Sequence, residues 1–507
     1  MDIYSLLDKN DQVELKIFNE LMKKNMKHQA TEIRKRLNLS RGRFSERIES
    51  LIARLKATFP DVSLNKTEDD LIALLLPLSF NVSDLYYCYL KEAVNYKILT
   101  HLYQDGKLDI FLIIEDLYLS ESTYYRRIRE INNVLAEFDL KIINGTLKGD
   151  ELQIRYFFFN LFWYFMPLTY IVEENDDLTI KNLIAIIENQ SKMTFSFFDY
   201  QKLFLWLKIT IKRINHAEKQ PSRVVDYYLI VVREKESYQQ TKNIFFRFLS
   251  RLALPFQNEE VLFVYLFLIS QFITPLKAPF FNDVFLDISP KIEPTITKLE
   301  SYLYAIFDRN SLTEESQVKI RYSFINIIYT ELFFTGFSVY FDNEKLQDIG
   351  QELVSLPFDV YVDKLYYILQ TIYQDIQKRP RTIMKQSKVV KNEALIFRLL
   401  CVLSYVDKVG TPRFLIGFDY YGDDLLKELS YEVTMDLVKQ APLVVCEPYM
   451  EDGNYDLVLS NSDVNKEKYG TSTYVFSEVL TPQEMRYLRR IIKDLHLEKI
   501  EKQGVKV

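Results

Sequence analysis

Hydrophobic positions recur at helical spacing in two stretches of the chain that lie 80 residues apart. In each stretch, four apolar residues follow the spacing i, i+4, i+7 and i+11, which places them on one face of a helix. They are Phe44, Ile48, Leu51 and Leu55 in residues 32–55, and Tyr124, Ile128, Ile131 and Leu135 in residues 112–135. The pattern therefore predicts a repeated structural unit near the N-terminus.

A leucine–serine pair precedes the long helix in both copies, as Leu39-Ser40 and Leu119-Ser120. Serine is a favoured N-cap residue because its hydroxyl oxygen accepts a hydrogen bond from a free backbone N–H of the first turn. A shorter apolar-periodic segment comes before each pair. Each copy thus predicts a helix, a short turn and a capped helix, which is the form of a helix-turn-helix. Two structural helical hairpins remain the alternative interpretation.

The outward face of the second long helix carries side chains that can contact DNA. At 100° per residue, Ser122, Arg126, Arg129 and Asn133 point away from the apolar face, and Thr123, Tyr125 and Arg127 flank them. Arginine pairs with guanine, asparagine with adenine, and serine with either. We therefore expect this helix to carry most base contacts.

The matching face of the first copy holds Gly42, Glu46, Glu49 and Ala53, and its two carboxylates would repel phosphates. Basic residues lie instead around the turn and flank of the first copy. They are Lys35, Arg36, Arg41, Arg43 and Arg47. We expect the first copy to grip mainly the DNA backbone.

Asn144-Gly145 follows the second copy and lies between two short β-prone runs. This dipeptide is a strong signal for a two-residue hairpin. A hairpin after a recognition helix forms a "wing", from which Lys141 and Lys148 could reach phosphates.

The remaining chain is predicted to be helical from about 173 to 395, with a break near 275–292 where prolines cluster. From about 411, four short runs read as buried strands that alternate with helices, which predicts a small, largely parallel α/β domain. They are RFLIGF, PLVVCE, YDLVLS and TYVFSE. The apolar stretch 157–172 contains Asn160 and Pro167 and is shorter than the roughly 20 residues of a spanning helix. We interpret it as a core helix and expect no membrane contact.

Composition excludes several functions. The net charge of −6 argues against a general nucleic-acid coat, although residues 1–60 hold 13 basic and 8 acidic side chains. Cys88, Cys401 and Cys446 are scattered, so neither a disulfide framework nor a zinc site is expected. No metal-ligand spacing, phosphate loop or nucleophile motif is present, so we expect no cofactor, no metal, no catalytic residues and no enzymatic activity. The polar N-terminus does not read as a signal peptide, which favours a cytoplasmic protein.

The segment GDELQIRYFFFNLFW after the wing, the segment RINHAEKQ in the first helical block, and the paired helix-turn-helix units together resemble the Mga/AtxA-type transcription regulators of Gram-positive bacteria. The resemblance implies a multidomain, mainly α fold. It comprises two N-terminal helix-turn-helix units, of which the second is winged, two helical-bundle domains like phosphotransferase-system regulation domains (PRDs), and a C-terminal α/β domain resembling the phosphotransferase IIB component. The expected boundaries are 1–62, 63–160, 161–285, 286–398 and 399–507.

Such regulators are usually activators, often of virulence or surface genes, and many self-associate through the C-terminal region. Histidines of PRDs can receive phosphate from the sugar phosphotransferase system, and His216 matches the first-domain position. This chain departs from the family in two places. The second block has no histidine, with Tyr329, Thr330 and Glu331 in the corresponding region, and the first strand of the α/β tail is followed by Asp419 and Tyr420 rather than by a nucleophilic cysteine.

These observations predict a cytoplasmic regulator that binds double-stranded DNA and forms a homodimer or higher oligomer through its C-terminal domain. A phosphotransferase-system phosphocarrier protein is the partner that would modify His216. Two alternatives stay open: a phosphotransferase-system enzyme or carrier, and a helical scaffold that binds another protein.

Overall fold

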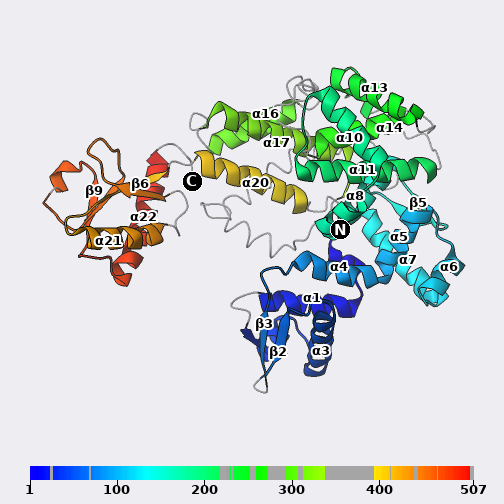
Figure 1. The fold of residues 1–507 in the computed structure, drawn as a ribbon, viewed down its shortest axis with the longest axis horizontal. Helices are drawn as coiled ribbons and strands as arrows, with labels where there is room; N and C mark the ends of the chain where they lie inside the picture. Colours follow the sequence, from blue (N-terminus) through cyan, green and yellow to red (C-terminus); the bar gives the residue numbers. More distant parts are fainter. Residues whose placement is uncertain are drawn as a thin grey trace. The chain divides into compact units, whose positions relative to one another are not determined.

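The structure is a computed structural model, which describes residues 1–22, 27–67, 70–216, 225, 228–229, 232–251, 258–271, 293–306, 312–336, 338, 393–410, 413–438, 444–464 and 466–502. These residues are mainly helical, with a parallel sheet near the C-terminus (Figure 1). Contacts divide the chain into two units. The first comprises Met1–Asp287, Tyr329–Asp342 and Arg379–Ala394, and the second comprises Ile288–Ile328, Asn343–Lys378 and Leu395–Val507.

The first helix-turn-helix is a complete winged helix. Its elements are η1 (Ile3–Leu6), α1 (Lys9–Met22), β1 (Lys27–Gln29), α2 (Ala30–Arg36), α3 (Arg41–Thr58), β2 (Ser63–Lys66) and β3 (Leu71–Leu75). The three strands form an antiparallel sheet in the order β1-β3-β2. The sequence pattern did not reveal this wing. Because β3 pairs with both β1 and β2, the sheet of the first winged helix continues to Leu75, past residue 62, where the end of this unit was expected.

The second helix-turn-helix repeats this plan. Its elements are α5 (Val94–Asp105), α6 (Ile110–Asp116), α7 (Glu121–Ala136), β4 (Lys141–Ile143) and β5 (Thr146–Lys148). An isolated antiparallel β-bridge between Lys107 and Thr146 occupies the position that strand β1 has in the first copy. The hairpin predicted from Asn144-Gly145 is present, with φ of 52° and 74° at these two residues. A Cβ at Gly145 would lie 2.6 Å from the backbone oxygen of Leu108, so the position requires glycine.

The turns of the two copies match hydrogen bond for hydrogen bond. Leu39 N donates to Arg34 O and Leu119 N donates to Ile114 O, each at 3.0 Å. Asn38 and Tyr118, the residues before these leucines, have φ of 51° and 50°. This arrangement is the Schellman ending of a helix, in which one residue adopts the left-handed conformation.

The predicted caps and apolar faces are confirmed. Ser40 Oγ accepts from Arg43 N at 3.3 Å, and Ser120 Oγ accepts from Thr123 N at 3.2 Å. All four apolar residues of α3 are at most 1% exposed, and in α7 Tyr124, Ile131 and Leu135 are buried while Ile128 is half-buried. Fully burying a side chain of this size contributes roughly 1.5–3 kcal/mol, so these faces hold each α-hairpin in place.

Two helices join the winged helices to the rest of the first unit. α4 (Val82–Glu92) contacts both α5 and α8 (Glu151–Phe165), and α8 starts three residues after the wing strand β5. The helices that follow are α9 (Leu168–Glu174), α10 (Leu178–Ser191), α11 (Phe197–His216), α13 (Glu236–Arg251) and α14 (Asn258–Ser270). Trp206 of α11 stacks on Phe267 of α14 with ring centroids 4.1 Å apart.

The apolar stretch 157–172 forms core helix in its first part, whereas Tyr170 and Val172, in the following helix, are each 37% exposed. In the first part, Phe157, Phe158 and Leu161 of α8 are fully buried, and α8 ends at Phe165, two residues before Pro167. Among the described residues, the helices are too short or too polar to cross a bilayer.

Three further helices follow, α16 (Glu293–Ile306), α17 (Glu314–Phe333) and α20 (Glu393–Gly410). The first two lie in the stretch that was predicted to be helical, and α20 runs beyond its end at about 395. The break predicted at 275–292 and residues 339–392 of the stretch predicted to be helical lie outside the described residues. Two expected domain boundaries, 160/161 and 398/399, fall inside the continuous helices α8 and α20.

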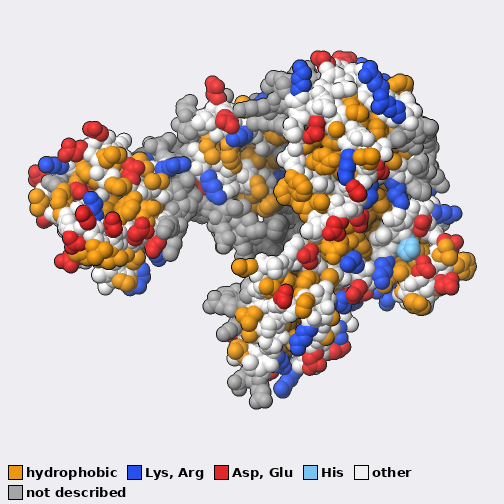
Figure 2. All heavy atoms as spheres, viewed as in Figure 1, with side chains coloured by type: hydrophobic (Ala, Val, Ile, Leu, Met, Phe, Trp, Pro, Cys, Tyr) orange, Lys and Arg blue, Asp and Glu red, His pale blue; other side chains and the backbone are white. Residues whose placement is uncertain are grey.

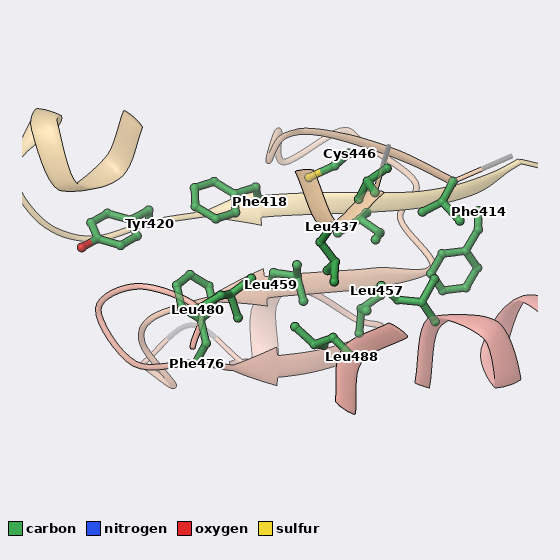
Figure 3. Close-up of a cluster of buried hydrophobic side chains, with 14 residues drawn as sticks. Phe414, Phe418, Tyr420, Leu437, Cys446, Leu457, Leu459, Phe476, Leu480 and Leu488 are labelled. Carbon is green, nitrogen blue, oxygen red and sulfur yellow. The ribbon is translucent and has the colours of Figure 1, made fainter. Parts of the chain in front are cut away.

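The C-terminal α/β fold matches the predicted alternation. It contains β6 (Phe414–Asp419), α21 (Asp424–Val438), β7 (Val444–Pro448), β8 (Leu457–Ser460), η4 (Lys466–Lys468), β9 (Ser472–Val475) and α22 (Pro482–Lys502). All strand pairs are parallel, in the order β7-β6-β8-β9. Figure 3 shows the core, in which Phe414 and Phe418 of β6 lie near Leu437 of α21 and Leu488 of α22. Thr481 caps α22, because its hydroxyl accepts a hydrogen bond from Glu484 N at 3.3 Å.

Candidate nucleic-acid interface

The outward face of α7 is exposed as the helical pattern predicted. Ser122, Arg126, Arg129 and Asn133 are all exposed, while Tyr124 on the opposite face is 2% exposed. Neither Arg126 nor Arg129 forms an ion pair within the described part of the chain. Two guanidinium groups on an open helix face can therefore meet an anion without first breaking an internal contact.

The flanking residues of α7 are partly committed to its N-terminus. The Ser122 and Thr123 hydroxyls lie 3.0 Å and 2.9 Å from Ser120 Oγ, so both take part in the cap. Tyr125 is 48% exposed and packs edge-on against Tyr124. Its hydroxyphenyl group is thus accessible beside the arginines.

Arg127 differs from the other two arginines. Its guanidinium pairs with Asp8 and, at 3.1 Å, with Glu130, and its side chain is only 15% exposed. The sequence placed Arg127 among the DNA contacts, but the structure commits it to joining α7 to the segment before α1.

The wing is held against α7 by a residue that the sequence pattern did not single out. Asn132 Oδ1 accepts from Ile142 N at 2.6 Å, and Asn132 Nδ2 donates to Ile142 O at 3.2 Å. This two-way amide contact fixes β4 relative to the outward face of α7. Lys141 and Lys148 are paired across the hairpin, so the wing presents two cations next to each other.

The first copy divides in the same way between exposed and committed basic residues. Lys35, Arg41 and Arg43 are exposed, and they form no ion pair within the described residues. Arg36 pairs with Glu20 at 3.2 Å but keeps 42% of its side chain exposed. Arg47 is 13% exposed and donates to Glu14 at 3.1 Å, so it acts inside the fold rather than on its surface.

Glu14 is the centre of a buried polar cluster between the first winged helix and α4. Its carboxylate, 1% exposed, accepts from Arg47 of α3 and from the Tyr89 hydroxyl of α4 at 2.8 Å. Arg54 lies over the Tyr89 ring, 4.1 Å from its centroid. Burial and the neighbouring Glu14 raise the pKa of Tyr89, and burial raises the pKa of Asp11 to about 6 despite its ion pair with Arg54. The charged side chains of this cluster therefore stabilise the fold and are not available to contact DNA.

The helical blocks hold the candidate switch residues. His216 is the last residue of α11 that the structure describes, and its side chain lies outside the described set. Tyr329 and Thr330 of α17 are 2% and 3% exposed, and the Thr330 hydroxyl donates to Ser270 O at 2.5 Å. These two hydroxyls pack inside the first unit, so they are poor substrates for modification.

Cys446 lies within β7 and is 5% exposed. Burial and the neighbouring Glu447 raise its pKa to about 12, so the thiol stays protonated at neutral pH. Within the described residues, no group of three or more His, Cys, Asp or Glu side chains is placed to hold a metal ion.

Exposed arginines on a capped helix, a wing fixed to that helix and a second copy of the same unit define the class of tandem winged helix-turn-helix proteins. Residues 78–162, from just before α4 to within α8, match the Mga helix-turn-helix domain. A protein of Streptococcus pneumoniae serotype 4, described as "Putative trans-acting regulator", is 21% identical over 216 residues. That match covers 41% of this chain and 42% of the relative. The expected resemblance to Mga-type regulators is confirmed by these two matches, and residues 78–162 contain the shared helix-turn-helix domain.

Proposed function

We propose that this protein regulates transcription by binding duplex DNA, with α7 in the major groove. The observation that carries the proposal is the pair Arg126 and Arg129, exposed and free of ion pairs in the described structure, on a helix whose wing is fixed by Asn132. Helix-turn-helix proteins place the second helix in the major groove with its N-terminal part on base edges. Arg126 and Arg129 would contact guanines or phosphates, and Asn133 and Ser122 would contact neighbouring bases.

In this proposal the first copy contributes phosphate contacts from Lys35, Arg41 and Arg43, with Arg36 reaching out from its pair with Glu20. Tyr125 and Lys148 would add contacts at the flank and wing of the second copy. Arg47 and Arg127 would support the interface indirectly, since carboxylates inside the fold hold both.

The test is a salt-titrated gel shift with duplex DNA from upstream of the protein's own gene. The Arg126→Ala/Arg129→Ala variant is compared with wild type and with Glu46→Ala/Glu49→Ala, which changes the equivalent positions of the first copy. Each lost base contact costs roughly 1–3 kcal/mol, so we expect at least a thirtyfold loss of affinity in the arginine variant. Each lost phosphate contact lowers the salt slope by about 0.9.

The glutamate variant is expected to bind as well as wild type or more tightly, because it removes two negative charges from a DNA-facing helix. Full promoter affinity in the arginine variant, with native circular dichroism, would refute the assignment of α7. Absence of salt-dependent binding by the wild type would favour the scaffold alternative.

We further propose that the α11 region and the C-terminal α/β fold regulate this activity. The parallel order β7-β6-β8-β9 supports the likeness to a IIB component, and protonated, buried Cys446 argues against phosphate transfer by this domain. The α/β fold would then serve self-association. Phosphate on His216 would add about −2 charge and so shift the equilibrium between the free and the associated protein. Unchanged assembly and transcription in both His216→Asp and His216→Ala would exclude a histidine switch.

A further inference from the structure

Three large hydrophobic side chains of the second winged helix lie in solvent. Phe111 and Leu112 of α6 are 84% and 57% exposed, and Tyr118 in the following turn is 95% exposed. Phe111 and Leu112 are neighbours on the exposed side of α6, and Tyr118 lies in the turn two residues after the helix ends. Ile113, on the opposite side of α6, packs into the core and is 2% exposed. Figure 2 shows hydrophobic and acidic side chains together at the edge where Figure 1 places α6. We call Phe111, Leu112 and Tyr118 the α6 patch.

The first copy shows that the fold does not need these side chains. At an offset of 80 residues, the equivalents of the α6 patch are Thr31, Glu32 and Asn38, all exposed and all polar. The hydrogen bonds of the two turns are the same. Asparagine tolerates the left-handed conformation at this position, whereas an aromatic residue adopts it at a cost in free energy. Tyr118 has a φ of 50°, and its side chain is exposed, so burial of the ring does not offset the conformational cost.

The charges around the two segments are reversed. Residues 105–121 contain five acidic side chains and one lysine, and all five acidic residues are exposed. The equivalent residues 25–41 contain five basic side chains and one glutamate. The segment before α3 therefore suits phosphate, while the segment before α7 repels it. Anionic membrane surfaces are disfavoured for the same reason.

We propose that the α6 patch docks a basic helix with an apolar face, presented by a protein of the transcription apparatus bound beside this one on DNA. The apolar stripe supplies the buried centre of such an interface, and Glu115, Asp116 and Glu121 supply the polar rim that pairs with lysine or arginine. The inference rests on the proposed DNA binding through α7, which immediately follows the patch. In this proposal α6 contacts a protein and α7 contacts DNA.

The test replaces the patch by the residues of the first copy, as Phe111→Thr/Leu112→Glu/Tyr118→Asn. The same fold accepts these residues in α2, so the variant is expected to fold, and unchanged circular dichroism with unchanged promoter affinity checks this. Leu178→Thr, at another exposed leucine, is the control. In transcription with purified RNA polymerase holoenzyme and promoter DNA, loss of a central apolar anchor predicts about a tenfold or larger fall in activated transcript. The control is expected to match wild type.

A photo-crosslinking residue at position 118 of the full chain identifies the occupant. On promoter DNA with the holoenzyme, we expect a crosslink to a basic helix of a polymerase subunit, weakened by Glu115→Lys/Asp116→Lys. A crosslink to DNA or to a second copy of this chain, or full activity of the patch variant, would overturn the proposal. Failure of wild type to bind promoter DNA would instead remove the proposed function, and this inference with it.

Discussion

A buried ion-pair chain in the first unit allows a quantitative prediction. Arg155 of α8 is 0% exposed and donates to Glu260 of α14 at 2.6 Å and 3.1 Å, and to Glu151 at 3.0 Å. Glu151 also accepts from Arg213 of α11 at 2.8 Å and 3.1 Å. Burial alone would raise the pKa of Glu151, but Arg155 and Arg213 outweigh it and lower the pKa.

The perturbation is Glu260→Gln, which keeps the shape of the side chain and removes its charge. Breaking one partner of a buried pair costs about 3–5 kcal/mol because the remaining charge is left uncompensated. Glu151 still pairs with Arg155, so we expect the lower end, about 3 kcal/mol. The double variant Arg155→Met/Glu260→Leu removes both charges, and its stability is expected to lie much closer to wild type or above it.

Hydrogen exchange on the full chain measures this effect locally, without requiring two-state unfolding of a large protein. A loss of about 3 kcal/mol corresponds to roughly 150-fold faster exchange of the α8 and α14 amides. The C-terminal strands β6 and β8 serve as an internal reference, which the substitution is expected to leave unchanged. If α8 amides in Glu260→Gln exchanged within threefold of wild type, or the double variant were the less stable of the two, the reasoning would be wrong.

Three further outcomes follow from contacts described above. Arg47→Ala leaves buried Glu14 with only the more distant Arg54 as a cation and is expected to lower the free energy of unfolding by about 2–3 kcal/mol, whereas exposed Arg43→Ala changes mainly the salt slope of DNA binding. Urea unfolding and gel shifts separate the two, and the reverse pattern would contradict the assignment. Ser120→Ala removes the cap of α7 and costs about 1 kcal/mol, visible as faster exchange at its first turn. Asp11 binds its proton more tightly when folded, with a pKa raised by burial from 3.8 to about 6, so its contribution to stability falls as pH rises through this window. Asp11→Asn is expected to gain thermal stability relative to wild type at pH 7 but not at pH 4, and an equal effect at both would disprove this account.

Local patterns in the sequence predicted the parts of this fold that depend on local contacts. The caps at Ser40 and Ser120, the apolar faces and the Asn144-Gly145 hairpin were all predicted, because each is specified within about a dozen residues. The first wing was missed, since β1 has three residues and its partner strand β3 lies more than 40 residues further along. The pairing of β1 with β3 joins residues that are far apart in the chain, so it produces no periodic pattern in the sequence.

The candidate site shows the same difference between features set by local contacts and features set by long-range contacts. Arg126 and Arg129 were placed correctly on the exposed face by helical geometry alone. Arg47 and Arg127 looked equivalent to them in sequence, yet Glu14 and Asp8, which are 33 and 119 residues away, hold these side chains. A surface arginine can be separated from a structural one only when its carboxylate partner is known.

The Glu14 cluster also limits how the duplicated unit can be rearranged. A tandem duplication ordinarily leaves two modules that can be exchanged, deleted or recombined separately. Here the Tyr89 hydroxyl from α4 and the Arg47 guanidinium from α3 both donate to one buried carboxylate of α1, so removing α4 would take away one of the hydrogen bonds of that carboxylate. Arg127 of α7 also pairs with Asp8, ahead of α1, and this ion pair ties the second winged helix to the first. The two winged helices are therefore inherited as one piece. If both bind DNA as proposed, an operator for this protein has to keep its two contact regions at a fixed spacing.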